Sequence, residues 1–216
     1  MASETVDISH KTFVGFDALC SSLDNQGLRP LVVTGALKTI LINHFSDENS
    51  IQDPDLKHAI WDILPNRSKI NIDSVYRWNP DEAERGLGIY IKRNSMKKST
   101  LYMADLFGAT KENDREFSGI WIGSHTLFCV GANPAQAEIL GTEVLQELEQ
   151  FSPVIRDTLR MVRFRVAEIG ALGQLDRRDK RYVVPITVSW AYGVSWVLRQ
   201  QARPLDKLDV SLIFMN

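Results

Sequence analysis

The 216-residue sequence has few cysteines, no long hydrophobic run and almost no net charge. Its two cysteines, Cys20 and Cys129, are too few for a disulfide framework and indicate a reducing compartment. No apolar run reaches about 18 residues, and the first residues show no basic segment followed by an apolar one, so we expect neither a membrane span nor a signal peptide. A net charge of −2 gives no general argument for nucleic-acid binding. These absences indicate a protein that is made and folded in a cytosol.

The sequence also lacks the residue spacings that carry most known enzyme chemistry. It contains no GxSxG turn, no HExxH motif, no phosphate-binding loop and no paired CxxC. The glycines at positions 86 and 88 lack both a third glycine and a following helix, which a dinucleotide site needs. Asp53 and Asp55, on either side of Pro54, are typical of a helix-entry turn. We therefore predict no catalytic residue, no metal ligand and no cofactor.

Two segments have the apolar spacing of helices. In segment 31–45, apolar residues recur at helical intervals, and the polar run SDENS ends the pattern. A second helix begins after Asn133, which caps it, with Pro134 in its first turn, and we expect a break at Ser152 and Pro153. Its solvent face is predicted to carry four glutamates: Glu138, Glu143, Glu147 and Glu149.

The remaining segments read as β-strands, and one of them is unusually long. In segment 182–198, large apolar residues occupy every even position and small or polar residues occupy most odd ones, which predicts a strand with one buried face. At roughly 3.3 Å per residue this strand exceeds about 50 Å, whereas strands usually have about five or six residues. Further strands are expected within 68–80, 86–95, 118–123, 125–133, 161–172 and 208–216, and an exposed loop at 94–117.

The predicted elements form an α+β protein, with an antiparallel sheet that has long C-terminal strands and one or two helices packed on it. No repeat, low-complexity tract or linker divides the chain, so we expect a single structural domain. Within it we distinguish a partly ordered N-terminal arm (1–30), a helical region (31–67) and an α+β region (68–216).

Two residues that suggest a metal site have a simpler interpretation. His125 and Cys129 share one face of a predicted strand, but they lie about 13 Å apart along it. This distance excludes a shared metal ion within the strand. We predict a buried thiol and a surface imidazole.

Strand tryptophans could form a ligand platform, but they are more often core or interface residues. We expect Trp190 and Tyr192 to lie in the subunit core. Trp196, farther along the same strand, is predicted to lie nearer a seam between subunits.

Basic residues gather in two groups, each next to a predicted strand end. One interpretation is that these residues are solvated loop charges without a partner. The other is that they dock onto an acidic partner or onto DNA phosphate. An antiparallel sheet could bring both groups to one rim of the subunit or place them at opposite rims. The groups are Lys92, Arg93, Lys97 and Lys98, and Arg177, Arg178, Lys180 and Arg181.

The order of elements resembles tail terminator, or tail-completion, proteins of tailed bacteriophages and related neck proteins. A hairpin ends at CVGANPAQ, a helix follows, and RFRVAEIGALGQLDRRDKRYVVPITVSWAYGVSWVLRQ supplies two long strands. The earlier SVYRWNPDEAERGLGIYIKRN is similar to an aromatic–Asn–Pro segment before a strand with a basic end. The resemblance covers about residues 68–216, and this chain is longer than the small members because of its helical region 31–65. The matching residues are Arg77, Trp78, Pro80, Gly170, Leu175 and Trp196.

The resemblance implies a structural protein of the virion tail or neck, assembled in the cytoplasm of a bacterial host. Terminators form a ring, usually a hexamer, that caps the tail tube and joins it to the head connector. The implied partners are other copies of the chain, the tail tube protein, the connector and, in a contractile tail, the sheath protein.

The resemblance also implies that DNA passes through the ring without sequence-specific binding, which the near-neutral charge suits. The long strand fits a ring if its far half extends onto a neighbouring subunit.

Two alternatives stay open. One keeps the structural class but places the protein as a sheath cap in the neck or as a baseplate component. The other is a small enzyme or ligand-binding domain that uses the tryptophan-rich sheet and His125.

Overall fold

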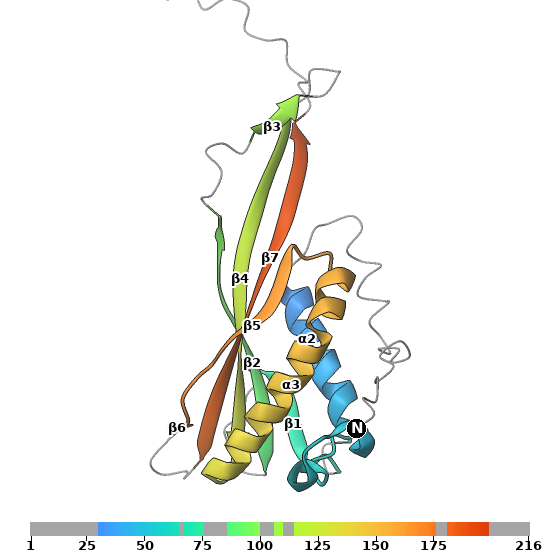
Figure 1. Ribbon diagram of the computed structural model, residues 1–216, viewed down its shortest axis with the longest axis vertical. Coiled ribbons are helices and arrows are strands. Elements are labelled where there is room, and N and C mark those ends of the chain that lie inside the picture. The colour runs from blue at the N-terminus through green and yellow to red at the C-terminus, as the bar shows by residue number, and fades with distance from the viewer. Residues whose placement is uncertain are drawn as a thin grey trace, which may run out of the picture.

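The computed structural model describes residues 30–64, 67–75, 86–99, 106–109, 115–175 and 181–198. These residues form one mixed sheet with two helices on the same face (Figure 1), so the predicted α+β class is confirmed. The elements are α2 (Pro30–Phe45), η2 (Glu48–Ser50), η3 (Pro54–Leu56), β1 (Ile70–Ser74), β2 (Leu87–Lys98), β3 (Leu106–Ala109), β4 (Arg115–Gly131), α3 (Pro134–Thr158), β5 (Arg163–Ile169), β6 (Gly173–Gln174) and β7 (Tyr182–Leu198).

The sheet has the strand order β1-β2-β4-β7-β5, with β3 beside β4 and β6 beside β7. All pairs are antiparallel except β1 and β2, which run parallel. The prediction of a purely antiparallel sheet is therefore wrong at this edge. Ile70 lies opposite Leu87, so both strands enter the sheet at the same end, and no direct hairpin can join them.

The two longest strands, β4 and β7, pair with each other at the centre of the sheet. Each has 17 residues, and they pair without interruption from Arg115 opposite Leu198 to Gly131 opposite Tyr182. The long strand predicted at 182–198 is thus confirmed. The predicted runs 118–123 and 125–133 are one strand, and much of the predicted loop 94–117 belongs to β2, β3 and β4. Small residues at 118, 119, 123 and 124 hide the alternation that would have revealed β4.

The core lies between the helices and one face of the sheet. It is built from the apolar stripes of α2 and α3 and from alternate residues of β2, β4 and β7. The helix α3 continues through Pro153 to Thr158, so the predicted break is wrong. A proline inside a helix costs about 3 kcal/mol, and burial of Phe151 and Ile155 on either side of it offsets this cost. Within the described ranges, neither helix has the length and apolar character needed to cross a bilayer.

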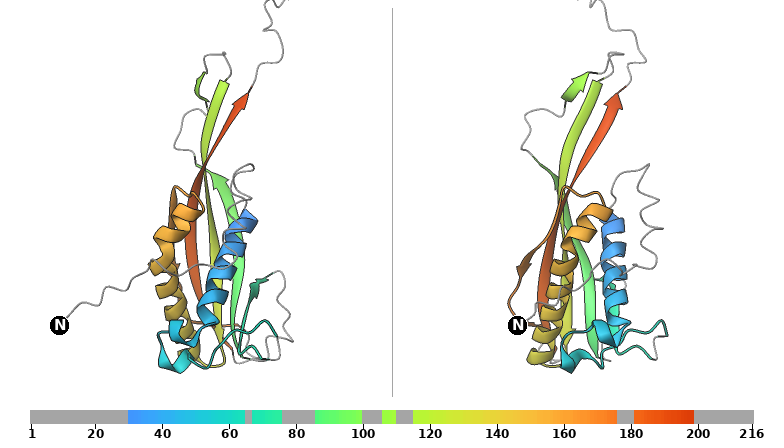
Figure 2. Two further views of the ribbon diagram at one scale, coloured as in Figure 1. Left: turned by 90° about the vertical axis from the view of Figure 1, so that its right-hand side faces the viewer. Right: turned by 45° about the vertical axis from the view of Figure 1, so that its right-hand side comes forward.

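The far half of the β4–β7 ladder projects beyond the helices (Figures 1 and 2). Pairing with β2 stops at Trp121 of β4, and pairing with β5 stops at Ala191 of β7. Beyond these residues β3 and β7 are the described strands that pair with β4, and one further backbone hydrogen bond runs from Ser99 to the carbonyl of Ile120. We call residues 115–120 of β4 and 192–198 of β7 the arm. Seven residues of extended chain give the arm a length of about 23 Å, and its first residues, Tyr192 and Val194, still pack against the core.

Candidate functional site

The first basic group lies within β2, in the part beyond its pairing with β1, rather than only next to a strand end. Lys92 and Lys97 are exposed and stand opposite Thr126 and Ile122, on the sheet face away from the helices. Arg93 is exposed on the opposite face, across from His125, and Lys98 is half-buried at the end of the strand. The group is therefore spread over both faces of the sheet, and it leads from the body to the base of the arm.

The structure does not bring Arg181 close to this group. Arg181 directly precedes β7 and is half-buried, whereas Lys97 lies in the same row as Ile122 and Ala191. Ten residues of β7, or about 33 Å, separate Arg181 from the level of Lys97, and six residues, or about 20 Å, separate it from the level of Lys92, Thr126 and Thr187. Three other predicted interface residues, Arg177, Arg178 and Lys180, lie outside the described residues.

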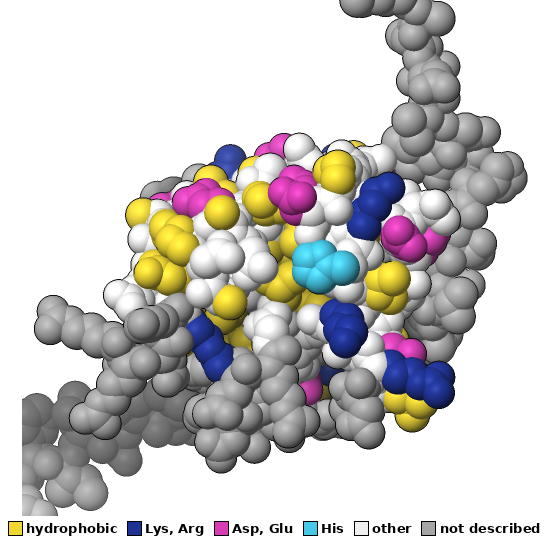
Figure 3. Space-filling model, turned by 90° about the horizontal axis from the view of Figure 1, so that it is seen from below, with side chains coloured by type: hydrophobic (Ala, Val, Ile, Leu, Met, Phe, Trp, Pro, Cys, Tyr) yellow, Lys and Arg dark blue, Asp and Glu magenta, His cyan; other side chains and the backbone are white. Residues whose placement is uncertain are grey.

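The end of the molecule opposite the arm shows no described patch of a single charge. Lysine, arginine, aspartate and glutamate side chains are interspersed there with hydrophobic ones (Figure 3). Such a mixture does not favour strong electrostatic attraction to a uniformly charged surface.

The predicted core position of Trp190 and Tyr192 is confirmed. Trp190 is fully buried and Tyr192 is 8% exposed, and their rings stack with centroids 5.8 Å apart. The Trp190 ring lies directly over Gly123, where an added Cβ would come within 2.4 Å of it. The backbone of Trp196 lies in the arm, but its side chain is not described, so its place at a seam stays a prediction.

His125 is buried, so the predicted surface imidazole is wrong, whereas the predicted buried thiol of Cys129 is confirmed. Trp190 Nε1 donates to His125 Nδ1 at 2.9 Å, so the proton of the neutral ring is on Nε2. That nitrogen donates to Thr34 Oγ1 at 2.9 Å, and Thr34 donates to the Pro30 carbonyl at 3.2 Å. Burial, together with the charge of Arg93, lowers the pKa of His125 to about 4. The imidazole is thus a fixed, neutral link between β4, β7 and α2.

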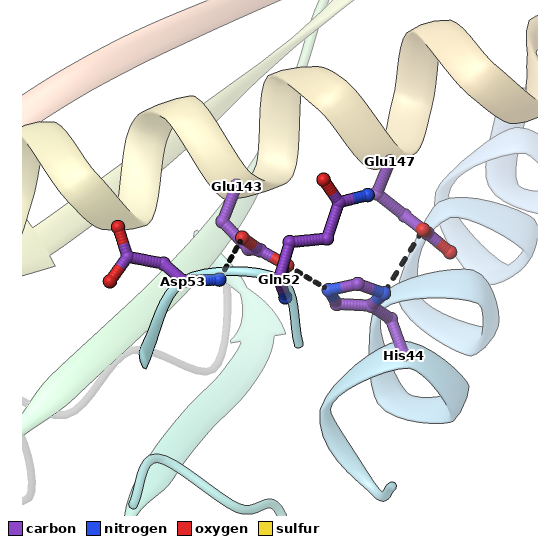
Figure 4. Close-up of polar contacts among 5 residues, drawn as sticks. All are labelled: His44, Gln52, Asp53, Glu143 and Glu147. Carbon is purple, nitrogen blue, oxygen red and sulfur yellow. Dashed lines mark hydrogen bonds and ion pairs between the residues drawn. The ribbon is translucent and has the colours of Figure 1, made fainter. Parts of the chain in front are cut away.

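A second buried polar network joins α2 to α3 (Figure 4). His44 Nε2 lies 2.9 Å from Glu143 Oε1, and His44 Nδ1 lies 3.0 Å from Glu147 Oε2. Glu143 also accepts the backbone N–H groups of Gln52 and Asp53, at 2.8 and 3.2 Å. The network therefore holds the loop after α2 against α3.

The charges of the network stabilise one another. Burial opposes the charged form of His44, but the hydrogen bonds and charges of Glu143 and Glu147 outweigh it and raise the pKa of His44 to about 9. Burial likewise opposes ionisation of Glu143, yet its bonds from His44 and two backbone N–H groups lower its pKa. The two nitrogens of His44 face different carboxylates on opposite sides of the ring, so these groups are not arranged to bind one metal ion. Among the described residues, no group of side chains could hold a metal.

Glu143 and Glu147 were predicted on the solvent face of the helix, and this prediction is wrong because both are 3% exposed. A usable signal was present. Leu140, Val144 and Leu148 form a stripe in which Glu143 and Glu147 hold neighbouring positions, so these glutamates face the core. A buried pair of carboxylates requires a cationic partner, and His44 occupies a core-facing position of α2.

The chain was compared with protein families and with curated proteins. No family model matches it, and no curated protein matches it. The described polar networks join β4, β7 and α2 around His125, and α2 and α3 around His44. The feature of the fold that goes beyond what a self-contained domain needs is the arm.

Proposed function

We propose that this protein is a tail terminator: a virion structural protein that forms a ring, with six copies, on the end of a tail tube. The observation that carries the proposal is the arm, in which the β4–β7 ladder continues past the helices that cover its base. The arm consists of the β4–β7 ribbon with the four residues of β3 beside it, and a ribbon of two strands is at best marginally stable in water. An arm that projects from its own body therefore gains stability from contact with another chain.

A ring gives such an arm a partner in every subunit. In a closed ring each copy contacts the next through the same pair of surfaces, so one projecting element per subunit is matched by one receiving surface. The body beneath the arm suits this role, because Trp190 and the His125 network fix the base of the arm and the His44 network joins the two helices of the body. The proposed partners are further copies, the tail tube protein and the head connector, and the double-stranded DNA passes through the opening.

The experiment is complementation of a phage in which the gene is deleted. The proposal expects tails without heads in the deletion, and head-joined particles when the full chain is supplied. A matched pair of variants separates the arm from the body. Gly193→Asp places a charge on the arm where an added Cβ meets open space, and Gly35→Asp does the same on α2. We expect only Gly193→Asp to reduce joining, and equal joining by both would contradict a role for the arm.

Labelling with an antibody against the chain tests its position. The terminator proposal expects label at the head-proximal end of the tail. Label at the distal end would favour the alternative of a baseplate component.

A further inference from the structure

The outer edge of β7 within the arm is unpaired in the described part of the chain. The carbonyls of Pro185 and Ala191 accept bonds from the β5 side, from Gly170 and Val162. Because the polar groups of successive strand residues point to alternate sides, the other odd residues of β7 face the same way. The backbone N–H and C=O groups of residues 193, 195 and 197 therefore point outward, past the end of β5.

Two other exposed edge segments of this sheet carry features that discourage strand addition. Beyond its pairing with β1, the edge strand β2 carries Lys92, Arg93, Lys97 and Lys98 and has a register shift between Arg93 and Met96. The opposite edge strand, β5, carries Arg163, Arg165 and Glu168 and has a register shift between Val166 and Glu168. Charged residues and bulges on edge strands are common means of preventing unwanted pairing.

The arm edge has neither protection. Residues 192–198 read YGVSWVL, with no charge and no proline, and they pair with β4 without a register shift. A long, regular, uncharged edge promotes pairing with another strand. Charges and register shifts protect the edges of β2 and β5, whereas the arm edge of β7 has neither. This contrast indicates that the arm edge pairs with a specific strand.

We propose that the outer edge of β7 binds residues 208–216 of a second copy of this chain as an added strand, which rests on the proposed ring. This segment, LDVSLIFMN, lies outside the described residues, and its sequence was predicted above to form a strand. Its nine residues are enough to cover the seven residues of the edge, 192–198. Strand addition of this kind gains affinity from main-chain hydrogen bonds.

The connecting segment favours a neighbour over the same chain. Residues 199–207, RQQARPLDK, separate the end of β7 from the donated strand. Hairpin loops that fold back on their own strand usually have about two to five residues. Nine extended residues span about 30 Å, which is enough to leave the arm tip and reach an adjacent subunit.

The first test uses two variants of one residue. Gly193→Pro removes an outward N–H and leaves pairing with β4 intact, because the polar groups of Gly193 face away from β4. Gly193→Ala keeps that N–H and adds a methyl group where nothing lies within 4 Å. The expected result is normal assembly by the alanine variant and at least a tenfold weaker assembly by the proline variant, measured by sedimentation. Equal assembly by both variants overturns strand addition, although the ring itself stands.

The second test identifies the source of the added strand. A chain carrying Val210→Pro and Leu212→Pro has an intact edge and a defective donor, whereas Gly193→Pro has the reverse. In hydrogen exchange, the peptide covering residues 192–198 should be protected in the wild-type chain and lose protection at about half of its amides in the donor-defective chain. Adding the Gly193→Pro chain should restore that protection. No restoration, with the wild-type peptide protected, means that each chain covers its own edge and overturns the proposal. Fast exchange in an assembled wild-type chain also overturns it, and a wild-type chain that never assembles contradicts the proposed function itself.

Discussion

His44 makes the stability of this fold dependent on pH above neutrality. Its pKa is about 9 in the native state, against 6.5 for an unperturbed histidine. Below pH 6.5 the ring is protonated in both states, so its stabilising effect is fully present. Between these two values the native state keeps a proton that the unfolded state releases, so the free energy of unfolding falls as the pH rises. At about 1.4 kcal/mol per pKa unit, the loss by pH 9 is about 3 kcal/mol.

The assay is urea-induced unfolding, followed by tryptophan fluorescence, at pH 6.5, 7.5 and 8.5. Higher pH is avoided because burial raises the pKa of the Cys129 thiol, which adds a loss of stability of the same sign. We expect the wild-type chain to lose about 2–3 kcal/mol across this range. A wild-type profile that is flat from pH 6.5 to 8.5 would refute the reasoning.

The control is His44→Gln, which removes the titrating group and leaves two buried carboxylates without their cation. Breaking a buried pair in this way costs about 3–5 kcal/mol. The two carboxylates then hold a proton more readily, so a fall of stability with pH can remain, but between pH 6.5 and 8.5 it should be smaller than in the wild-type chain. If this variant does not fold, Glu147→Gln keeps the bond between His44 and Glu143 and should show a smaller slope than the wild-type chain. A wild-type slope in either variant would show that another group is responsible.

Four further predictions concern the arm and its base. Because the pKa of His125 is lowered to about 4, stability should fall as the pH drops from 6.5 towards 4, and urea unfolding of His125→Gln should show a smaller fall. Gly123→Ala places a methyl group against the Trp190 ring and should cost about 1–3 kcal/mol in unfolding free energy, whereas an unchanged stability would contradict the tight contact. Trp190→Ala should cost about 3–5 kcal/mol in folding. Trp196→Ala should fold but weaken assembly by about 2 kcal/mol, and equal losses of stability with intact assembly would disprove the seam.

The long C-terminal strand and the two helices could be predicted because their patterns are local. The two-residue period of 182–198 needs no knowledge of its neighbours, and the cap and proline at 133 and 134 start α3 as expected. The full length of β4 could not be predicted from the sequence pattern. Glycine and serine residues interrupt the alternation of β4, and the extended form of this strand depends on its hydrogen bonds to β7. The parallel pairing of β1 and β2 depends equally on a contact between segments distant in sequence.

The buried networks could be predicted only in part. Charged residues are normally assigned to the surface, and Glu143 and Glu147 depart from this because His44 approaches from another helix. His125 was placed at the surface because its acceptor role for Trp190 appears only when β4 and β7 pair in this register. The basic residues of β2 were expected next to a strand end, as loop charge or as docking residues, and their spread over two faces follows from the strand pairing, not from composition.

The mass of the assembled protein tests the proposed terminator ring most directly. The purified full chain would be measured by sedimentation equilibrium, alone and with purified tail tube protein. Six copies of a 24.5 kDa chain weigh 6 × 24.5 = 147 kDa. The proposal predicts a closed species near that mass, formed by the chain alone or on the ends of tubes. A chain that stays at 24.5 kDa under both conditions would contradict the proposal.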